Sequence, residues 1–331
     1  MRFKKKLLLL FCAILTFFTI TYQSQYAYAQ TNYLYLGGMP AGFTIKSNGA
    51  VVIGLSDVVT DEGIFSPAKN ADIQIGDILT EIDKQEICGS ESIAKILKNS
   101  NGNPLEITVV RNGEKTTKFL TPKQDKNGKY KLGVFLRDDL SGIGTITYFT
   151  NDGKFASLGH PILNDNKSIM DIKGGKAYLC SIVGVEKGEK GRAGELQGIF
   201  IDDRKIGQIL KNTQTGIYGE IDKSFNFNNL PQMEIANAKM GKARIFTCID
   251  GESVQEFAIS IVKIDNYNKE NKNFVIKIDD KNLLSVTGGI LQGMSGSPIV
   301  QDGKIVGAVT HVFINDPTRG FGISIDKMLE N

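Results

Sequence analysis

Residues 288–299 read GGILQGMSGSPI, and their centre follows the pattern Gly-x-Ser-Gly-x-Pro, with Gly293, Ser295, Gly296 and Pro298 at the named positions. Glycine at position 293 allows a tight turn with backbone angles that a side chain would oppose. Such a turn directs the amides of Gly293 and Ser295 into one small space, where they can stabilise a tetrahedral oxyanion. The segment therefore predicts that Ser295 is a nucleophile. The alternative is a loop that only joins two strands, because short motifs also arise by chance.

The composition of the chain is that of a globular protein with a nearly neutral body. Its 331 residues are enough for two domains, and 41% of them are hydrophobic. The net charge of +3 depends on four basic residues at positions 2–6, because beyond residue 29 there are 35 basic and 36 acidic side chains. This balance argues against nucleic acid as a partner.

Cysteine and histidine are too sparse to predict a metal centre. The histidines are His160 and His311 alone. The cysteines lie far apart and include no Cys-x-x-Cys pair: Cys12, Cys88, Cys180 and Cys248. Beyond the N-terminal segment we expect them to be buried free thiols. We expect neither a metal nor another cofactor.

Residues 1–29 have the layout of a secretory signal peptide. Basic residues precede the uncharged apolar run Leu7–Tyr22, and Ala27-Tyr28-Ala29 offers a small-x-small cleavage pattern. The apolar run is short for a membrane span, but an uncleaved anchor is the alternative. In either case we expect the body of the protein to act outside the cytosol, and an anchor would add membrane association.

Residues 33–121 predict a small domain of strands and helices. Strand patterns occur at Tyr33–Leu36 and Val51–Leu55, and Ser90–Leu97 has helical apolar spacing. A hairpin signal, Arg111-Asn112-Gly113, separates two further strand patterns. The most specific part is the segment Ala-x-x-Ala-x-x-x-x-Gly-Asp-Ile over residues 68–78, which resembles a PDZ domain.

The resemblance to PDZ domains implies a peptide-binding site. Ala41, Gly42 and Phe43 would form the loop that holds a peptide carboxylate, and the peptide would add as a strand beside the helix at 90–99. This loop is not the usual Gly-Leu-Gly-Phe, so an internal peptide or the protein's own chain is the alternative ligand. Residues 122–131 are polar, contain Pro122 and Gly128, and predict a linker.

Residues 132–331 predict a mainly β domain, because short apolar runs separated by turns recur and helical patterns are scarce. His160, in Ser157-Leu-Gly-His-Pro-Ile162, is the candidate general base for Ser295. The structural alternative is a solvated loop histidine. His311 follows a strand after the Ser295 turn and is a weaker candidate that we expect to contact substrate.

A third residue, a carboxylate, should orient the imidazole of the base. Asp280 lies shortly before the Ser295 turn, and each of the candidates could instead be a surface charge. The competing carboxylates are Asp152, Asp202, Asp203 and Asp279.

The chain resembles the SpoIVB family of serine peptidases. The motifs that carry the resemblance are SLGHPI at 157–162, Ile206-Gly207 with Asn212-Thr213, GIYG at 216–219, TGGILQGMSGSP at 287–298 and GAVTHVFINDP at 307–317. The resemblance implies a PDZ domain followed by a chymotrypsin-like double β-barrel. It also implies Ser295 as nucleophile, His160 as base, Asp280 as the acidic partner, and Gly293 and Ser295 as the oxyanion hole.

The same resemblance implies a role in sporulation. Such an enzyme is secreted from the forespore into the space between the two forespore membranes. It cleaves itself and then a membrane-tethered regulator, which triggers processing of the late mother-cell sigma factor, and its PDZ domain restrains or directs self-cleavage. The alternatives are a general envelope protease and a non-enzymatic PDZ protein that binds peptides.

Overall fold

The computed structural model describes residues 33–87, 90–164 and 167–330. The signal peptide or anchor predicted at residues 1–29 lies outside this part of the chain, as do Cys12 and Cys88. Within these three ranges, no helix is both long and apolar enough to cross a membrane. Cys180 and Cys248 are buried free thiols, as predicted.

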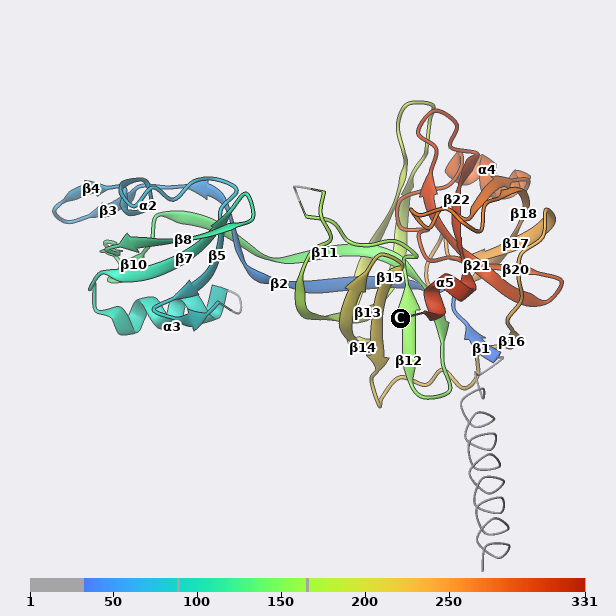
Figure 1. Ribbon diagram of the computed structural model, residues 1–331, viewed down its shortest axis with the longest axis horizontal. Coiled ribbons are helices and arrows are strands. Elements are labelled where there is room, and N and C mark those ends of the chain that lie inside the picture. The colour runs from blue at the N-terminus through green and yellow to red at the C-terminus, as the bar shows by residue number, and fades with distance from the viewer. Residues whose placement is uncertain (1–32, 88–89, 165–166, 331) are drawn as a thin grey trace, which may run out of the picture.

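The structure is mainly β, and its larger body consists of two barrels (Figure 1). In the first barrel each strand pairs with the next in the order β2-β11-β12-β15-β14-β13, and β13 pairs again with β2, so that six strands close a ring. These strands are β2 (Pro40–Leu55), β11 (Val134–Phe149), β12 (Lys154–Ser157), β13 (Ile172–Glu186), β14 (Glu195–Thr213) and β15 (Gly216–Ile221). The edge strands β1 (Tyr33–Leu36) and β16 (Gln232–Glu234) extend the sheet beside β11.

The second barrel is also closed and has the strand order β17-β18-β19-β22-β21-β20. Its strands are β17 (Gly241–Thr247), β18 (Gln255–Ile264), β19 (Phe274–Ile278), β20 (Pro298–Gln301), β21 (Lys304–Val312) and β22 (Arg319–Ser324). Two short helices belong to it, α4 (Lys281–Thr287) and α5 (Ile325–Leu329). The predicted chymotrypsin-like double barrel is confirmed.

The smaller body is the predicted PDZ domain (Figure 1). Its core lies between the helix α3 and the sheet that contains β5, β7 and β8. The elements are β3 (Val58–Thr60), β4 (Gly63–Phe65), α2 (Pro67–Asn70), β5 (Ile78–Ile82), β6 (Gln85–Glu86), α3 (Ser90–Ser100), β7 (Leu105–Arg111), β8 (Glu114–Leu120), β9 (Lys123–Gln124) and β10 (Tyr130–Lys131). Asn112 and Gly113 both have positive φ at the tip of the β7–β8 hairpin, as their sequence predicts.

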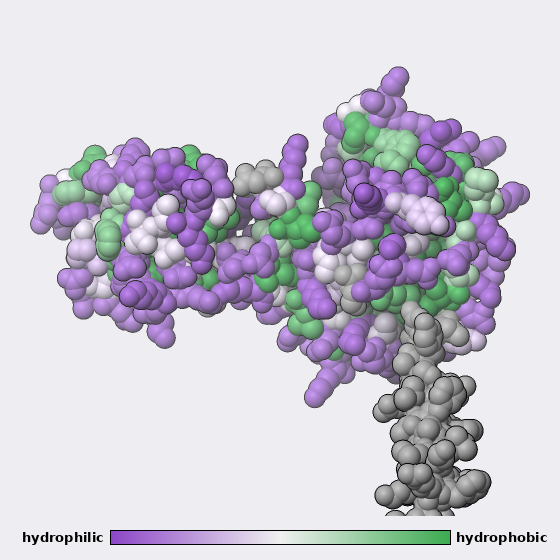
Figure 2. Space-filling model, in the orientation of Figure 1, coloured by the Kyte–Doolittle hydropathy of each residue, from purple (hydrophilic) through white to green (hydrophobic). Residues whose placement is uncertain are grey.

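Two long strands, β2 and β11, join the bodies and belong to both of them (Figure 1). They pair antiparallel from Val134 opposite Leu55, in the PDZ body, to Thr145 opposite Pro40, in the first barrel. Figure 2 shows two largely polar lobes with hydrophobic residues gathered around this connection. The PDZ domain is therefore inserted between two neighbouring strands of the first barrel.

The limits of the domains consequently differ from the prediction of 33–121, 122–131 and 132–331. Strands within residues 33–47 pair with strands of the larger body, and Ala41, Phe43 and Ile45 pack in the core of the first barrel. Residues 123–131 contain the β9–β10 hairpin rather than an open linker. Leu132 packs in the PDZ core, with Val134 and Leu136 against it.

Candidate active site

The turn that carries the predicted nucleophile Ser295, residues 293–296 and called the nucleophile turn below, lies between α4 and β20 and depends on two glycines. Gly293 and Gly296 both have φ of +94°, a region that favours glycine. A Cβ on Gly296 would lie 2.1 Å from the carbonyl oxygen of Thr145 and 2.6 Å from the amide of Leu158. Gly296 therefore lets this turn approach both β11 and the segment that carries His160.

Strand β11 holds the turn by donating hydrogen bonds to the backbone carbonyls of the turn. The Thr145 amide donates to the carbonyl of Ser295 at 2.9 Å, and the Thr145 hydroxyl donates to the carbonyl of Gly293 at 2.9 Å. The Thr147 hydroxyl donates to the carbonyl of Gly296 at 2.8 Å. The amides of Met294, Gly296 and Ser297 donate within the segment 291–297 or to β21. Among the described residues, neither the amide of Gly293 nor that of Ser295 donates a hydrogen bond.

His160 follows a strained turn in which Leu158 and Gly159 both have φ of +69°. Asn212 anchors the segment after it, because its amide group accepts from the Ile162 amide at 2.9 Å and donates to the carbonyls of Ile162 and Met170. The Nδ1 atom of His160 lies 2.9 Å from the carbonyl oxygen of Pro161. If Nδ1 carries the proton in this bond, Nε2 holds the lone pair that a general base requires.

Ser295 and His160 line the same cavity, which has a volume of about 640 Å³. The Ser295 hydroxyl donates to the carbonyl of Thr310 at 2.7 Å, and no bond joins it to the ring of His160. The described residues that line the cavity carry no Asp, Glu, Lys or Arg; most of them are apolar, such as Ile143, Ile290 and Val312.

His311 lines this cavity as well, and its ring centroid lies 4.8 Å from that of His160. Burial lowers the pKa of His160, against an opposing effect of the Pro161 carbonyl. Burial also lowers the pKa of His311, to about 4, and the neighbouring His160 and Lys272 add to this effect. Both rings are therefore neutral at neutral pH, as a general base should be.

Asp280, the predicted acidic partner, is placed differently. It is the N-cap of α4, where one carboxylate oxygen accepts from the amides of Asn282 and Leu283, each at 3.0 Å. It does not line the cavity, and it has no hydrogen bond to His160. The structure thus brings Ser295 and His160 together without Asp280, because the local helix already uses the carboxylate.

The competing carboxylates do not contact His160 either. Asp152 accepts from Thr150 and Lys154, and Asp279 accepts from Ser260. Asp202 and Asp203 lie on the exposed part of β14, away from the cavity lining.

The prediction that Ala41, Gly42 and Phe43 form a peptide-binding loop is wrong. These residues form part of β2 and are paired on both sides, with β11 and with β13. Gly42 is required by packing, since a Cβ would lie 2.3 Å from the ring of Phe200. A strand with two paired edges has no free amides for a peptide.

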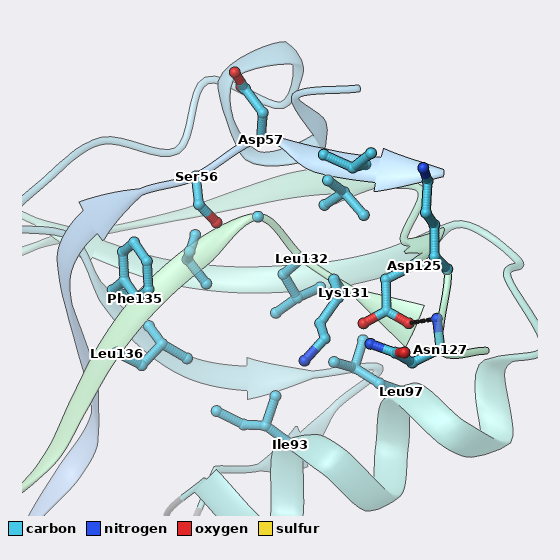
Figure 3. A pocket seen from close by; sticks show the side chains of 15 residues that line it. Ser56, Asp57, Ile93, Leu97, Asp125, Asn127, Lys131, Leu132, Phe135 and Leu136 are labelled. Atoms are coloured by element: carbon cyan, nitrogen blue, oxygen red, sulfur yellow. Dashed lines mark hydrogen bonds between the residues drawn. The ribbon is translucent and has the colours of Figure 1, made fainter. Parts of the chain in front are cut away.

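The PDZ body instead has a groove of about 540 Å³ between α3 and the start of β11 (Figure 3). Ile93 and Leu97 of α3 face Leu132 and Leu136 across it, and Val134 also lines the groove. Residues 134–136 pair with β2 on one edge, and no described strand pairs with their other edge. This free edge next to a helix is the arrangement to which a peptide adds as a strand.

Sequence reasoning missed several residues that build these sites. Thr145, Thr147 and Asn212 act through hydrogen bonds to distant backbone groups, and no local pattern marks them. The groove at 131–136 did carry a signal. Leu132-Gly133-Val134-Phe135 places a glycine between apolar residues just before a strand, and Gly133 has φ of +78°.

Comparison with known proteins agrees with this architecture. The family model described as SpoIVB peptidase S55 matches residues 128–329, and a PDZ domain model matches residues 58–111. No curated protein matches the chain.

Several solved structures are similar to parts of the chain. The PDZ domain of the SdrC-like protein Lmo2051 from Listeria monocytogenes is 21% identical, with a TM-score of 0.23, over 28% of this chain and 90% of the other. The active form of the Rv3671c protease from M. tuberculosis is 13% identical, with a TM-score of 0.34, over 58% and 72%. A Glu endopeptidase is 14% identical, with a TM-score of 0.34, over 57% and 83%.

Proposed function

Because the chain belongs to the SpoIVB peptidase S55 family and is a serine endopeptidase, we propose that Ser295 is its nucleophile and His160 its general base. The observation that carries this proposal is their shared cavity beside a glycine turn with two unused amides. The amides of Gly293 and Ser295 form the oxyanion hole in this reading.

The reaction is acyl transfer to serine. Nε2 of His160 takes the proton of the Ser295 hydroxyl while the oxygen attacks the carbonyl carbon of a peptide bond. The carbonyl oxygen becomes an oxyanion held by the two amides, and the imidazolium then protonates the leaving amine. Water, activated by the same imidazole, hydrolyses the acyl-enzyme.

Ser295 must turn before this reaction begins. Its hydroxyl donates to the carbonyl of Thr310, which lies on β21 at the wall of the cavity. A bound peptide strand offers its own amide to such a carbonyl, and this releases the hydroxyl toward His160. The uncharged lining of the cavity favours substrates with apolar side chains next to the cleaved bond.

The biological role that we propose is signalling during sporulation. The enzyme is secreted or anchored through residues 1–29 and acts in the space between the forespore membranes. It cleaves itself and then a membrane-tethered regulator, which triggers processing of the late mother-cell sigma factor. The support for this role is membership of the family.

The PDZ groove, in the same proposal, binds a peptide that restrains or directs self-cleavage. The groove lies at the start of β11, and Thr145 and Thr147 at the other end of this strand hold the nucleophile turn. A peptide in the groove therefore contacts a strand that also contacts the active site.

Labelling with a fluorophosphonate tests the catalytic assignment. We expect the wild-type protein to be labelled and to cleave itself, and we expect Ser295→Ala to abolish labelling. The cleavage rate should fall by up to about a millionfold, as for other serine peptidases. Ser285→Ala, on the exposed part of α4, is the matched control and should leave both readouts unchanged.

Two outcomes would change this proposal. Labelling that persists in Ser295→Ala would reject Ser295 as the nucleophile. Efficient cleavage of casein by the wild type, without self-cleavage, would favour a general envelope protease over a signalling enzyme.

A further inference from the structure

Asp280 has a structural task that a carboxylate is not needed to perform. It begins α4, and both hydrogen bonds to its side chain come from backbone amides of the first helical turn. Its own amide donates to the carbonyl of Ala258 in β18, which joins the start of the helix to the second barrel. Asn and Ser satisfy the first amides of a helix about as well as Asp does.

The other end of α4 leads directly into the nucleophile turn. The Thr287 hydroxyl donates within the segment 283–289, where carbonyls of Leu283 and Gly289 lie 2.8 Å and 2.7 Å away. Gly288 ends the helix with φ of +71°, and a Cβ there would lie 2.3 Å from the carbonyl of Gly188. The direction of α4 therefore determines the position from which the segment 290–295 continues toward the active site.

The ring of His160 already has an acceptor for Nδ1. The carbonyl oxygen of Pro161 lies 2.9 Å from this atom, in the position where a triad carboxylate would otherwise accept the proton. A backbone carbonyl can hold the tautomer and orientation of the ring as well.

We propose that Asp280 is a positioning residue that acts through α4 on the nucleophile turn, and that the Pro161 carbonyl orients His160 in place of a carboxylate. This inference rests on the proposed roles of Ser295 and His160. In this inference Asp280 caps the helix α4 and does not orient the imidazole of His160.

The test compares four substitutions at one position by kcat/KM, unfolding midpoint and pH profile. Asp280→Asn and Asp280→Ser keep the cap, so we expect kcat/KM within about threefold of wild type. Asp280→Ala loses the cap, and we expect a midpoint about 2–4 °C lower and a loss of about tenfold in kcat/KM. Asp280→Glu keeps the charge but caps poorly, so it should resemble Asp280→Ala.

The pH profile separates positioning from a direct role. In Asp280→Asn the acid limb of kcat/KM should stay where it is in wild type, because the carboxylate does not face the imidazole. Asp279→Asn is the matched control. The carboxylate of Asp279 is adjacent in sequence and accepts an exposed hydrogen bond from the Ser260 hydroxyl.

The opposite pattern would overturn the inference. An orienting carboxylate would give a loss of about 10⁴-fold in Asp280→Asn with an unchanged unfolding midpoint, and Asp280→Glu would be the better variant. If the wild type itself shows no Ser295-dependent cleavage, the proposed catalytic roles fail instead. The order of unfolding midpoints, with Asn and Ser above Ala and Glu, then still reports whether Asp280 is a cap.

Discussion

The two histidines of the chain line the same cavity, and we expect their protonation to affect both activity and stability. His160 accepts the serine proton in the proposed reaction, and His311 lies against it with a ring distance of 4.8 Å. The charged groups near His311 are Lys272 and Glu270, of which Lys272 lowers its pKa and Glu270 raises it. Apart from the Pro161 carbonyl, burial is what determines the state of His160.

We expect activity and stability to fall together below pH 6.5. The folded state binds protons on these rings at lower pH than the unfolded chain, whose histidines titrate near 6.5. The unfolding free energy should therefore be fully present above pH 6.5 and decline as the pH falls toward 4. The acid limb of kcat/KM should also lie below 6.5, because His160 must be neutral to act as a base.

The variant His311→Gln separates the two effects. It should make stability less dependent on pH between 6.5 and 4, as measured by chemical denaturation at each pH. The acid limb of kcat/KM should remain, since it belongs to His160, the proposed general base. Stability that does not change between pH 7 and 4.5 in the wild type would contradict this account.

At the scale of elements, the site depends on two segments that are held by side chains distant from them in the sequence. The segment after His160 is fastened by Asn212 of β14, and the nucleophile turn is fastened by Thr145 and Thr147 of β11. In each case a polar side chain satisfies backbone groups of a segment that has no regular structure of its own.

Removal of the Asn212 amide should loosen the histidine segment. Asn212→Ala removes the side-chain partner of the Ile162 amide and of the Met170 carbonyl, while the Ile162 carbonyl still accepts from the Met170 amide. We expect this loss to cost about 1–3 kcal/mol of unfolding free energy. We expect kcat/KM to fall by about tenfold or more, because His160 is no longer held in place. Denaturant unfolding and kinetic assays measure the two effects.

A matched control exists for this substitution. Asn226→Ala removes an exposed asparagine whose side-chain oxygen accepts a local hydrogen bond from the Asn228 amide, so it should change neither quantity. If Asn212→Ala kept full activity, the position of His160 would not depend on this anchor.

At the scale of the whole molecule, the insertion of the PDZ domain makes the segment before it part of the catalytic body. Ala41, Phe43 and Ile45 of β2 are buried in the core of the first barrel. Without β2, the strands β11 and β13 would each lose their pairing on one edge.

We therefore expect that residues 128–331 alone do not fold into an active peptidase, although they contain the whole family match. A chain that keeps residues 33–46 and joins them to residue 139 by a two-residue turn should fold and react with a fluorophosphonate. The reason is that Lys46 and Asp139 are already paired in antiparallel strands.

Self-cleavage of the same shortened chain tests the role of the PDZ domain. Its pattern or rate of self-cleavage should differ from wild type, because the proposed restraint is absent. An active, folded protein made of residues 128–331 would contradict the requirement for β2.

The parts of this protein that depend on local chemistry can be read from short stretches of the amino-acid sequence. The Gly293-x-Ser295-Gly296 turn, the histidine at 160, the Asn112-Gly113 hairpin and the strand patterns are all encoded within a few residues. They were sufficient to identify the family and the two kinds of domain, because glycine angles and apolar alternation are properties of short segments.

Which segments contact one another could be seen only in the folded chain. Ala41–Phe43 had the glycine content of a loop, but pairing with β13 and the ring of Phe200 makes it a central strand. Asp280 had the position of an acidic partner, but the helix that follows uses its carboxylate. Thr145 and Gly293 meet across 148 positions of the chain. Such contacts depend on the closure of both barrels, which no local pattern encodes.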